Sequence, residues 1–148
     1  MNMMPCGRLL ILLGLSVLTG CKNSSEPALT PVSGTVTREA RPLPGVQVRF
    51  IPQGATQGHG GAGTTDAEGA YEVVAHRSRN RKGLLPGTYK VVLTRRLLPD
   101  GSPLPPDVPP INSSARETVP LPYCDVKQTP WIVTIGAEAT TFDCPLKP

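Results

Sequence analysis

The chain has 148 residues, enough for one compact domain once an export segment is removed. Eighteen prolines and fifteen glycines interrupt it, and no long stretch repeats apolar residues at helical spacing, so we expect an all-β protein with long loops. Aromatic residues make up only 4%, which leaves the core to Val, Ile and Leu. The formal charge of +4 is mild and mixed with acidic residues, which argues against a nucleic-acid partner.

The first twenty residues have the pattern of a signal peptide, residues 1–20. Arg8 supplies a positive charge, and the apolar run at 9–18 is shorter than the ~20 residues of a membrane-spanning helix. The run ends in Thr19-Gly20-Cys21, which resembles the lipobox of bacterial lipoproteins. That resemblance implies cleavage before Cys21, a lipid on its thiol, and attachment to a membrane. An ordinary cleaved signal with Cys21 as an unmodified thiol is the alternative.

Residues 21–31 are mostly small or polar and predict the lipidated cysteine followed by a flexible tether. Nine extended residues reach at most ~30 Å, enough to lift a small domain clear of lipid headgroups. Lys22 stands where the inner-membrane retention signal of enteric bacteria would have aspartate. By that analogy we expect a cell-envelope location, with the outer membrane favoured over the inner membrane.

The folded domain, residues 32–148, contains short segments that predict strands separated by Gly/Pro turns, a pattern typical of a β-sandwich. These segments are residues 32–37, 46–51, 71–74, 88–94, 131–135 and 140–144. The glycine-rich stretch 53–63 lacks apolar anchors and predicts a mobile loop. A proline-rich insertion at 98–122 predicts extended structure, which Leu104, Val108 and Ile111 would dock on the sandwich.

Four motifs follow one another between Val32 and Leu93. They are VSGTV at 32–36, PLPGVQVRF at 42–50, TDAEGAY at 65–71 and LPGTYKV at 85–91. In this order they resemble the carboxypeptidase regulatory-like domain, a transthyretin-like β-sandwich, and especially the short lipoproteins of planctomycete-type bacteria that carry it. The resemblance implies a single small transthyretin-like or Ig-like sandwich with a C-terminal hairpin. Because the motifs hold turns and strand starts, the resemblance implies a fold and no particular activity.

Two of the four cysteines remain after processing. Cys6 leaves with the signal and Cys21 would carry the lipid, so Cys124 and Cys144 are left. In an oxidising envelope this pair predicts one disulfide, closing a loop of about twenty residues and worth ~3 kcal/mol. The alternative is a metal pair, but two sulfurs with no nearby histidine make a poor zinc site.

The densest charge run lies at residues 76–82 and provides the candidate contact residues Arg77, Arg79, Arg81 and Lys82. We expect a solvated loop that keeps the domain soluble. Binding of anionic lipid headgroups or acidic envelope polymers through screened electrostatics is the alternative.

The remaining polar residues predict neither a metal site nor a catalytic site. Asp66 and Gly69 fit a turn better than half a calcium loop, which would need six to eight oxygen ligands. His59 and His76 lie in separate loops and are expected to be solvated, whereas acid–base catalysis needs a positioned histidine. We therefore expect no enzyme activity, no cofactor and no metal. The expected partner is the membrane, through the lipid on Cys21. An envelope polysaccharide or a protein bound by the loops is the alternative.

Overall fold

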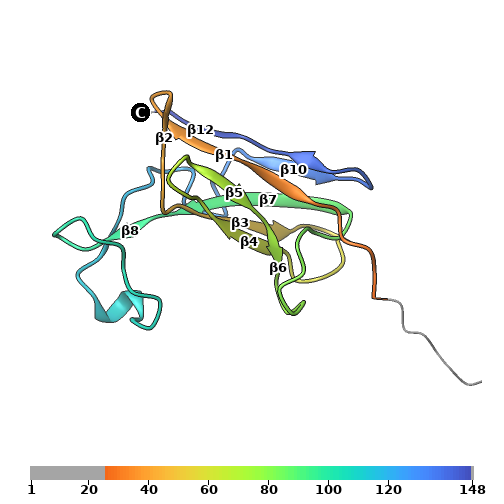
Figure 1. Ribbon diagram of the computed structural model, residues 1–148, viewed down its shortest axis with the longest axis horizontal. Helices are drawn as coiled ribbons and strands as arrows, with labels where there is room; N and C mark the ends of the chain where they lie inside the picture. The colour runs from red at the N-terminus through yellow and green to blue at the C-terminus, as the bar shows by residue number, and fades with distance from the viewer. Residues whose placement is uncertain (1–25, 148) are drawn as a thin grey trace, which may run out of the picture.

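The structure is a computed structural model that describes residues 26–147, and it shows two packed β-sheets with an arm at one end (Figure 1). In the first sheet, β1 (Val32–Arg38) is the central strand. It pairs antiparallel with β2 (Arg41–Pro42) and β5 (Ala70–Glu72), and parallel with β11 (Thr140–Thr141) and β12 (Cys144–Leu146). The expected all-β sandwich is confirmed.

The second sheet is antiparallel and has the order β10-β7-β3-β4-β6. Its strands are β10 (Ile132–Ile135), β7 (Gly87–Thr94), β3 (Gln47–Pro52), β4 (Gly61–Thr64) and β6 (Val74–Ala75). The strand expected at 71–74 is divided between the sheets, because the chain changes sheet at the fully buried Val73. The Val73 amide donates to the carbonyl of Val32 and joins the two layers at that point.

The core lies between the sheets, and valine is its commonest residue, in keeping with the low aromatic content. Along β3 the alternation holds, with Val48 and Phe50 buried and Gln47 and Arg49 exposed. Phe50 is the central aromatic, with its ring centroid 6.4 Å from those of Tyr71, Tyr89 and Phe142. The other fully buried side chains are Val32, Val36, Val46, Val73, Leu84, Val91, Leu93, Ile135 and Cys144.

The glycine-rich stretch 53–63 is only partly a loop, which corrects the expectation of a mobile segment. Its end belongs to β4, which pairs with β3 on one side and β6 on the other. A Cβ on Gly61 would lie 2.5 Å from the carbonyl oxygen of Val74, and one on Gly63 would lie 2.4 Å from that of Glu72. Glycine is required because the chain that changes sheets passes directly over this strand.

The last strands do not form the expected hairpin. β10 pairs with β7 in the second sheet, and the chain then crosses over so that β11 and β12 run parallel to β1. At the break between β11 and β12, one carboxylate oxygen of Asp143 accepts both the amide and the hydroxyl of Thr35, at 2.8 Å each. This side chain takes the place of a backbone carbonyl, so the parallel edge stays bonded across the break.

The proline-rich insertion stands away from the sandwich as an arm, residues 98–115 (Figure 1). Its base is the two-stranded sheet of β8 (Arg96–Leu97) and β9 (Arg116–Glu117), and its far part holds the short 3-10 helix η1 (Pro110–Asn112). Ile111 is 92% exposed, so the expectation that it docks on the sandwich is wrong. Within residues 26–147, no helix has the length and hydropathy needed to cross a membrane.

The folded chain begins slightly before the predicted boundary. Thr30, expected in the tether, is buried and exchanges two backbone hydrogen bonds of 2.8 Å with Leu84. Its hydroxyl also donates to the carbonyl of Gly136 at 2.6 Å. The predicted signal peptide and the predicted lipidation site Cys21 lie outside the described residues.

Candidate functional site at the tether end

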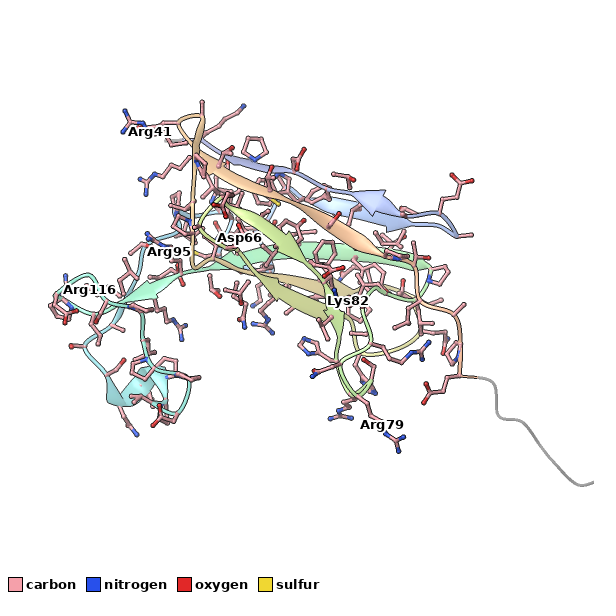
Figure 2. The ribbon with its side chains drawn as sticks, viewed as in Figure 1. Arg41, Asp66, Arg79, Lys82, Arg95 and Arg116 are labelled. Atoms are coloured by element: carbon pink, nitrogen blue, oxygen red, sulfur yellow. The ribbon has the colours of Figure 1, made fainter. Side chains whose placement is uncertain are left out.

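The basic loop, residues 76–82, lies beside the segment where the chain enters the sandwich. Arg81 bridges the two: one guanidinium nitrogen lies 3.0 Å from the Glu26 carboxylate, and the other donates to the carbonyl of Pro27 at 2.9 Å. The loop and the end of the tether are therefore held at the same end of the molecule, at the right of Figures 1 and 2.

The four predicted cations fall into two classes. Arg81 pairs with Glu26, and Lys82 pairs with Glu72, so these two charges are largely compensated. Arg77 and Arg79 are exposed and form no ion pair with another described residue. Figure 2 shows Arg79 extending from the end of the loop into solvent. Of the predicted set, Arg77 and Arg79 are the cations available to a partner.

The loop backbone is strained where these arginines stand. Arg77, Arg79 and Asn80 have φ values of 57°, 53° and 64°, in the left-handed region that favours glycine and tolerates asparagine. The left-handed conformation destabilises the fold by ~1 kcal/mol for each arginine, because it brings the Cβ close to the backbone. The conformation is held by the Ala75 amide, which donates to the Arg81 carbonyl at 2.9 Å, and by the Ser78 hydroxyl, which donates to the Ala75 carbonyl at 2.6 Å.

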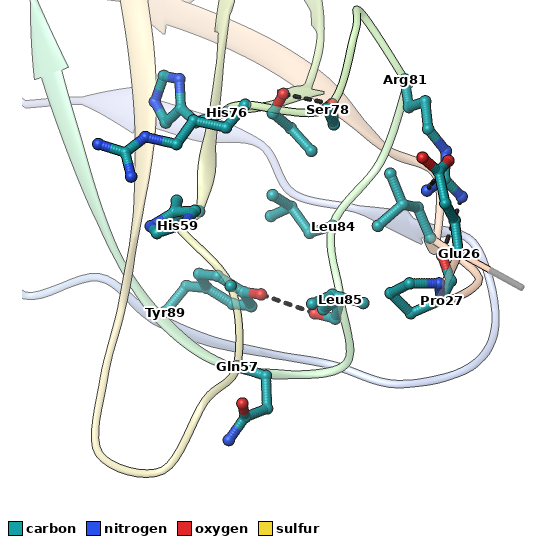
Figure 3. Close-up of a pocket in the computed structure, with 15 residues that line it drawn as sticks. Glu26, Pro27, Gln57, His59, His76, Ser78, Arg81, Leu84, Leu85 and Tyr89 are labelled. Carbon is teal, nitrogen blue, oxygen red and sulfur yellow. Dashed lines mark hydrogen bonds and ion pairs between the residues drawn. The ribbon is translucent and has the colours of Figure 1, made fainter. Parts of the chain in front are cut away.

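A cavity of about 200 Å³ opens under the loop (Figure 3). His59 and His76 line the same side of it, although the sequence places them in separate loops. They come together because the His76 amide donates to the carbonyl of Gly60 at 2.9 Å. Both side chains are exposed, as expected. Leu84 and Tyr89 supply the apolar side of the cavity.

Tyr89 fixes the floor of this cavity. Its ring is 1% exposed, and its hydroxyl donates to the carbonyl of Leu85 at 2.7 Å. Burial raises the pKa of the Tyr89 hydroxyl, so it stays protonated and keeps that bond. The cavity floor is therefore a packed, hydrogen-bonded side chain, while its rim carries the two imidazoles and Arg77.

The structure brings no further ligands to the histidine pair. Within residues 26–147, no group of three or more His, Cys, Asp or Glu side chains is placed to hold a metal ion. Ser78 donates to the backbone rather than to an imidazole. Asp66 is a turn residue, since one of its carboxylate oxygens accepts the amides of Glu68 and Ala70 at 3.0 and 2.8 Å.

The two cysteines expected to pair are free thiols in the structure. Cys144 is fully buried on β12, where its thiol lies beside the Tyr71 hydroxyl. Cys124 is half-buried in a turn, near the carboxylates of Glu117 and Asp125. The two sulfurs have different neighbours and are not bonded to each other, so the structure lacks the predicted disulfide. Burial raises the pKa of Cys144 to about 12 and also raises that of Cys124.

A wider groove of about 740 Å³ lies between the outer face of the second sheet and the arm. Arg49 on β3 and Arg95 and Arg96 after β7 line it, opposite prolines of the arm. Arg95 donates to the carbonyl of Pro44, and Arg96 approaches Glu117 at 3.9 Å. This groove is not anticipated from the sequence, because β3 and the arm meet only in the folded chain.

We compared the chain with protein-family models, curated proteins and solved structures. No protein-family model matches the chain, and no curated protein matches it. Among solved structures, the chain is similar to part of a 9R-lipoxygenase from Cyanothece, with 16% identity and a TM-score of 0.37. The match covers 84% of this chain and 17% of that one, so the chain spans less than a fifth of the lipoxygenase. At this TM-score the similarity carries no argument.

Proposed function

We propose that this protein is a lipid-anchored module of the cell envelope, whose β-sandwich acts as a structural or interaction domain without catalysis. The observation that carries the proposal is the run from Arg8 through the apolar residues 9–18 to Thr19-Gly20-Cys21. Nine residues later the chain enters the sandwich at Thr30. A thioether lipid on Cys21 with further acylation would give stable attachment, because each buried CH₂ contributes ~0.8 kcal/mol.

The sandwich is proposed to be of the carboxypeptidase regulatory-like type. The four motifs at 32–36, 42–50, 65–71 and 85–91 support this assignment. The motif at 65–71 has a scaffold role: Asp66 fixes a turn, and the Tyr71 hydroxyl donates to the carbonyl of Phe142 at 2.6 Å. These two side chains therefore have structural roles in the fold.

A binding role for the loops is the second candidate function. The groove beside the arm and the cavity under the basic loop favour it, because both combine arginine side chains with apolar walls. An envelope polysaccharide or a protein would be the ligand.

The anchor is tested by intact mass and membrane fractionation of the full chain expressed in a diderm bacterium. We expect a chain beginning at Cys21 with acyl mass added, in the outer-membrane fraction, and a Cys21→Ser variant that is released or unprocessed. Cys124→Ser is the matched control and should be acylated like the wild type. An unacylated, soluble wild type would disprove the anchor.

A further inference from the structure

The position of the basic loop relative to the tether limits how far that loop lies from an anchored lipid. Glu26 is five residues beyond Cys21, and five extended residues span at most ~18 Å. Arg81 contacts Glu26 and Pro27 directly, so residues 76–82 lie at the point where the tether leaves the fold. The arm is at the opposite end of the long axis (Figure 1).

The charge at this end is positive and partly uncompensated. Glu26 and Glu72 neutralise Arg81 and Lys82, and Arg77 and Arg79 remain as two exposed cations. Arginine donates several N–H groups in a planar fork, which suits the oxygens of a phosphate group. The rim of the 200 Å³ cavity adds the imidazoles of His59 and His76 beside Arg77.

The backbone strain indicates that stability alone does not explain these residues. Glycine would occupy the left-handed positions of Arg77 and Arg79 without a Cβ penalty. Strained conformations of this kind cluster at functional sites, where a contact compensates for the strain. Two arginines therefore occupy exposed, strained positions in a loop that lies near the anchor. This combination indicates a contact that the loop makes once the protein is anchored.

We propose that Arg77 and Arg79 bind the phosphates of anionic lipid headgroups and hold the sandwich with its tether end against the bilayer and the arm directed outward. This inference rests on the proposed lipid anchor, since the lipid brings the loop to the surface. Two basic residues near an anionic surface give about a 30-fold preference for the bound orientation at low salt. The preference falls as salt rises, because the contact is electrostatic.

The test uses the mature chain with a polyhistidine tag in place of Cys21, held on vesicles by a small fraction of nickel-chelating lipid. Amide hydrogen exchange at short labelling times is compared on phosphatidylcholine vesicles with and without phosphatidylglycerol. We expect exchange in residues 76–82 to slow roughly threefold or more on the anionic vesicles and to recover in high salt. The arm, residues 98–115, should exchange equally on both.

Paired variants identify the residues responsible. The double variant Arg77→Gln/Arg79→Gln should lose the slower exchange of residues 76–82. The control Arg41→Gln/Arg116→Gln changes two arginines at the left of Figure 2, away from the loop, and should retain the slower exchange. Unchanged unfolding midpoints would show that both variants fold. Equal loop exchange on the two kinds of vesicle, or slowing in the arm instead, would overturn the proposal. Because the tag replaces the natural lipid, that result is separate from the mass measurement, which alone decides whether Cys21 is lipidated.

Discussion

The sandwich and the proline-rich arm both carry aliphatic side chains but are stabilised in different ways. In the sandwich, the central strands bury side chains between the two sheets, and the Phe50 ring packs near three further aromatic rings. In the arm, η1 has no buried residue and Ile111 is exposed. The arm is held at its base instead, where one oxygen of Glu117 accepts the amides of Arg95, Thr118 and Val119.

This difference shows that apolar residues alone do not predict burial. The arm carries Leu104, Val108 and Ile111, and only the first two are even half-buried. Its prolines lack the amide donors needed to extend a sheet, so the arm cannot add strands to the sandwich and bury its apolar side chains that way. The carboxylate of Glu117 replaces the missing core as the local organiser.

Truncating a large side chain in each region gives the largest expected contrast. Phe50→Ala should lower the free energy of unfolding by ~4 kcal/mol, because it leaves a cavity among fully packed residues. Ile111→Ala should change it by less than ~0.5 kcal/mol, since the side chain is already in solvent. Urea unfolding of both variants measures this. A comparable loss for Ile111→Ala would mean that the arm has a core after all.

Adding a single methyl group tests how closely the sandwich is packed. Gly61→Ala should lower the free energy of unfolding by about 2 kcal/mol or more, because its Cβ would lie 2.5 Å from the Val74 carbonyl and 2.8 Å from Leu84. Gly136→Ala is the matched control, with no atom within 4 Å of the added Cβ, and should be within ~0.5 kcal/mol of the wild type. Equal stabilities for the two variants would show that β4 is not overlaid by the chain as described.

The buried thiol of Cys144 and the half-buried thiol of Cys124 differ in their expected effect on the pH dependence of stability. This effect is smaller than those of the core substitutions. Below pH 9 the thiol of Cys144 is neutral in both states, and between 9.0 and about 12 only the unfolded chain loses the proton. The free energy of unfolding should therefore fall by about 1.4 kcal/mol between pH 8 and pH 10 in reducing buffer, in addition to other titrations. Cys144→Ala should lose this part of the fall and Cys124→Ala should retain most of it, in urea titrations at each pH.

The same experiment without reductant tests the disulfide. A Cys124–Cys144 bond would abolish thiol titration in the wild type and raise its stability, by ~3 kcal/mol on the loop-entropy estimate. The mass of the unfolded chain after alkylation would show whether Cys124 and Cys144 react as free thiols or are protected by a disulfide. The free thiols of the structure predict two alkylated cysteines.

Much of the fold is predictable from local patterns. Alternation of apolar and polar residues at 32–37 and 46–51 marks strands, because the side-chain period of two applies wherever one face is buried. The Asp66 turn is likewise local, since its acceptor and donors are at most four residues apart. The basic composition of 76–82 and its exposure also follow from sequence alone.

Other features depend on contacts between residues far apart in the chain. β4 carries almost no side chains, so nothing in its own sequence marks it as a strand; its glycines are explained only by the chain that passes over them. The parallel pairing of β12 with β1 joins Cys144 to Val36, and local alternation cannot say which strand is the neighbour.

The candidate site divides in the same way. The sequence by itself determined that residues 76–82 are basic, and it predicted their exposure and a signal peptide that ends before Cys21. Only the tertiary structure decided that this loop lies beside the start of the fold, that Arg81 is compensated by Glu26 while Arg77 and Arg79 are free among the described residues, and that His59 and His76 share a cavity. Charge and exposure are properties of a segment, whereas a partner for that charge is set by which distant segments the sheets bring together.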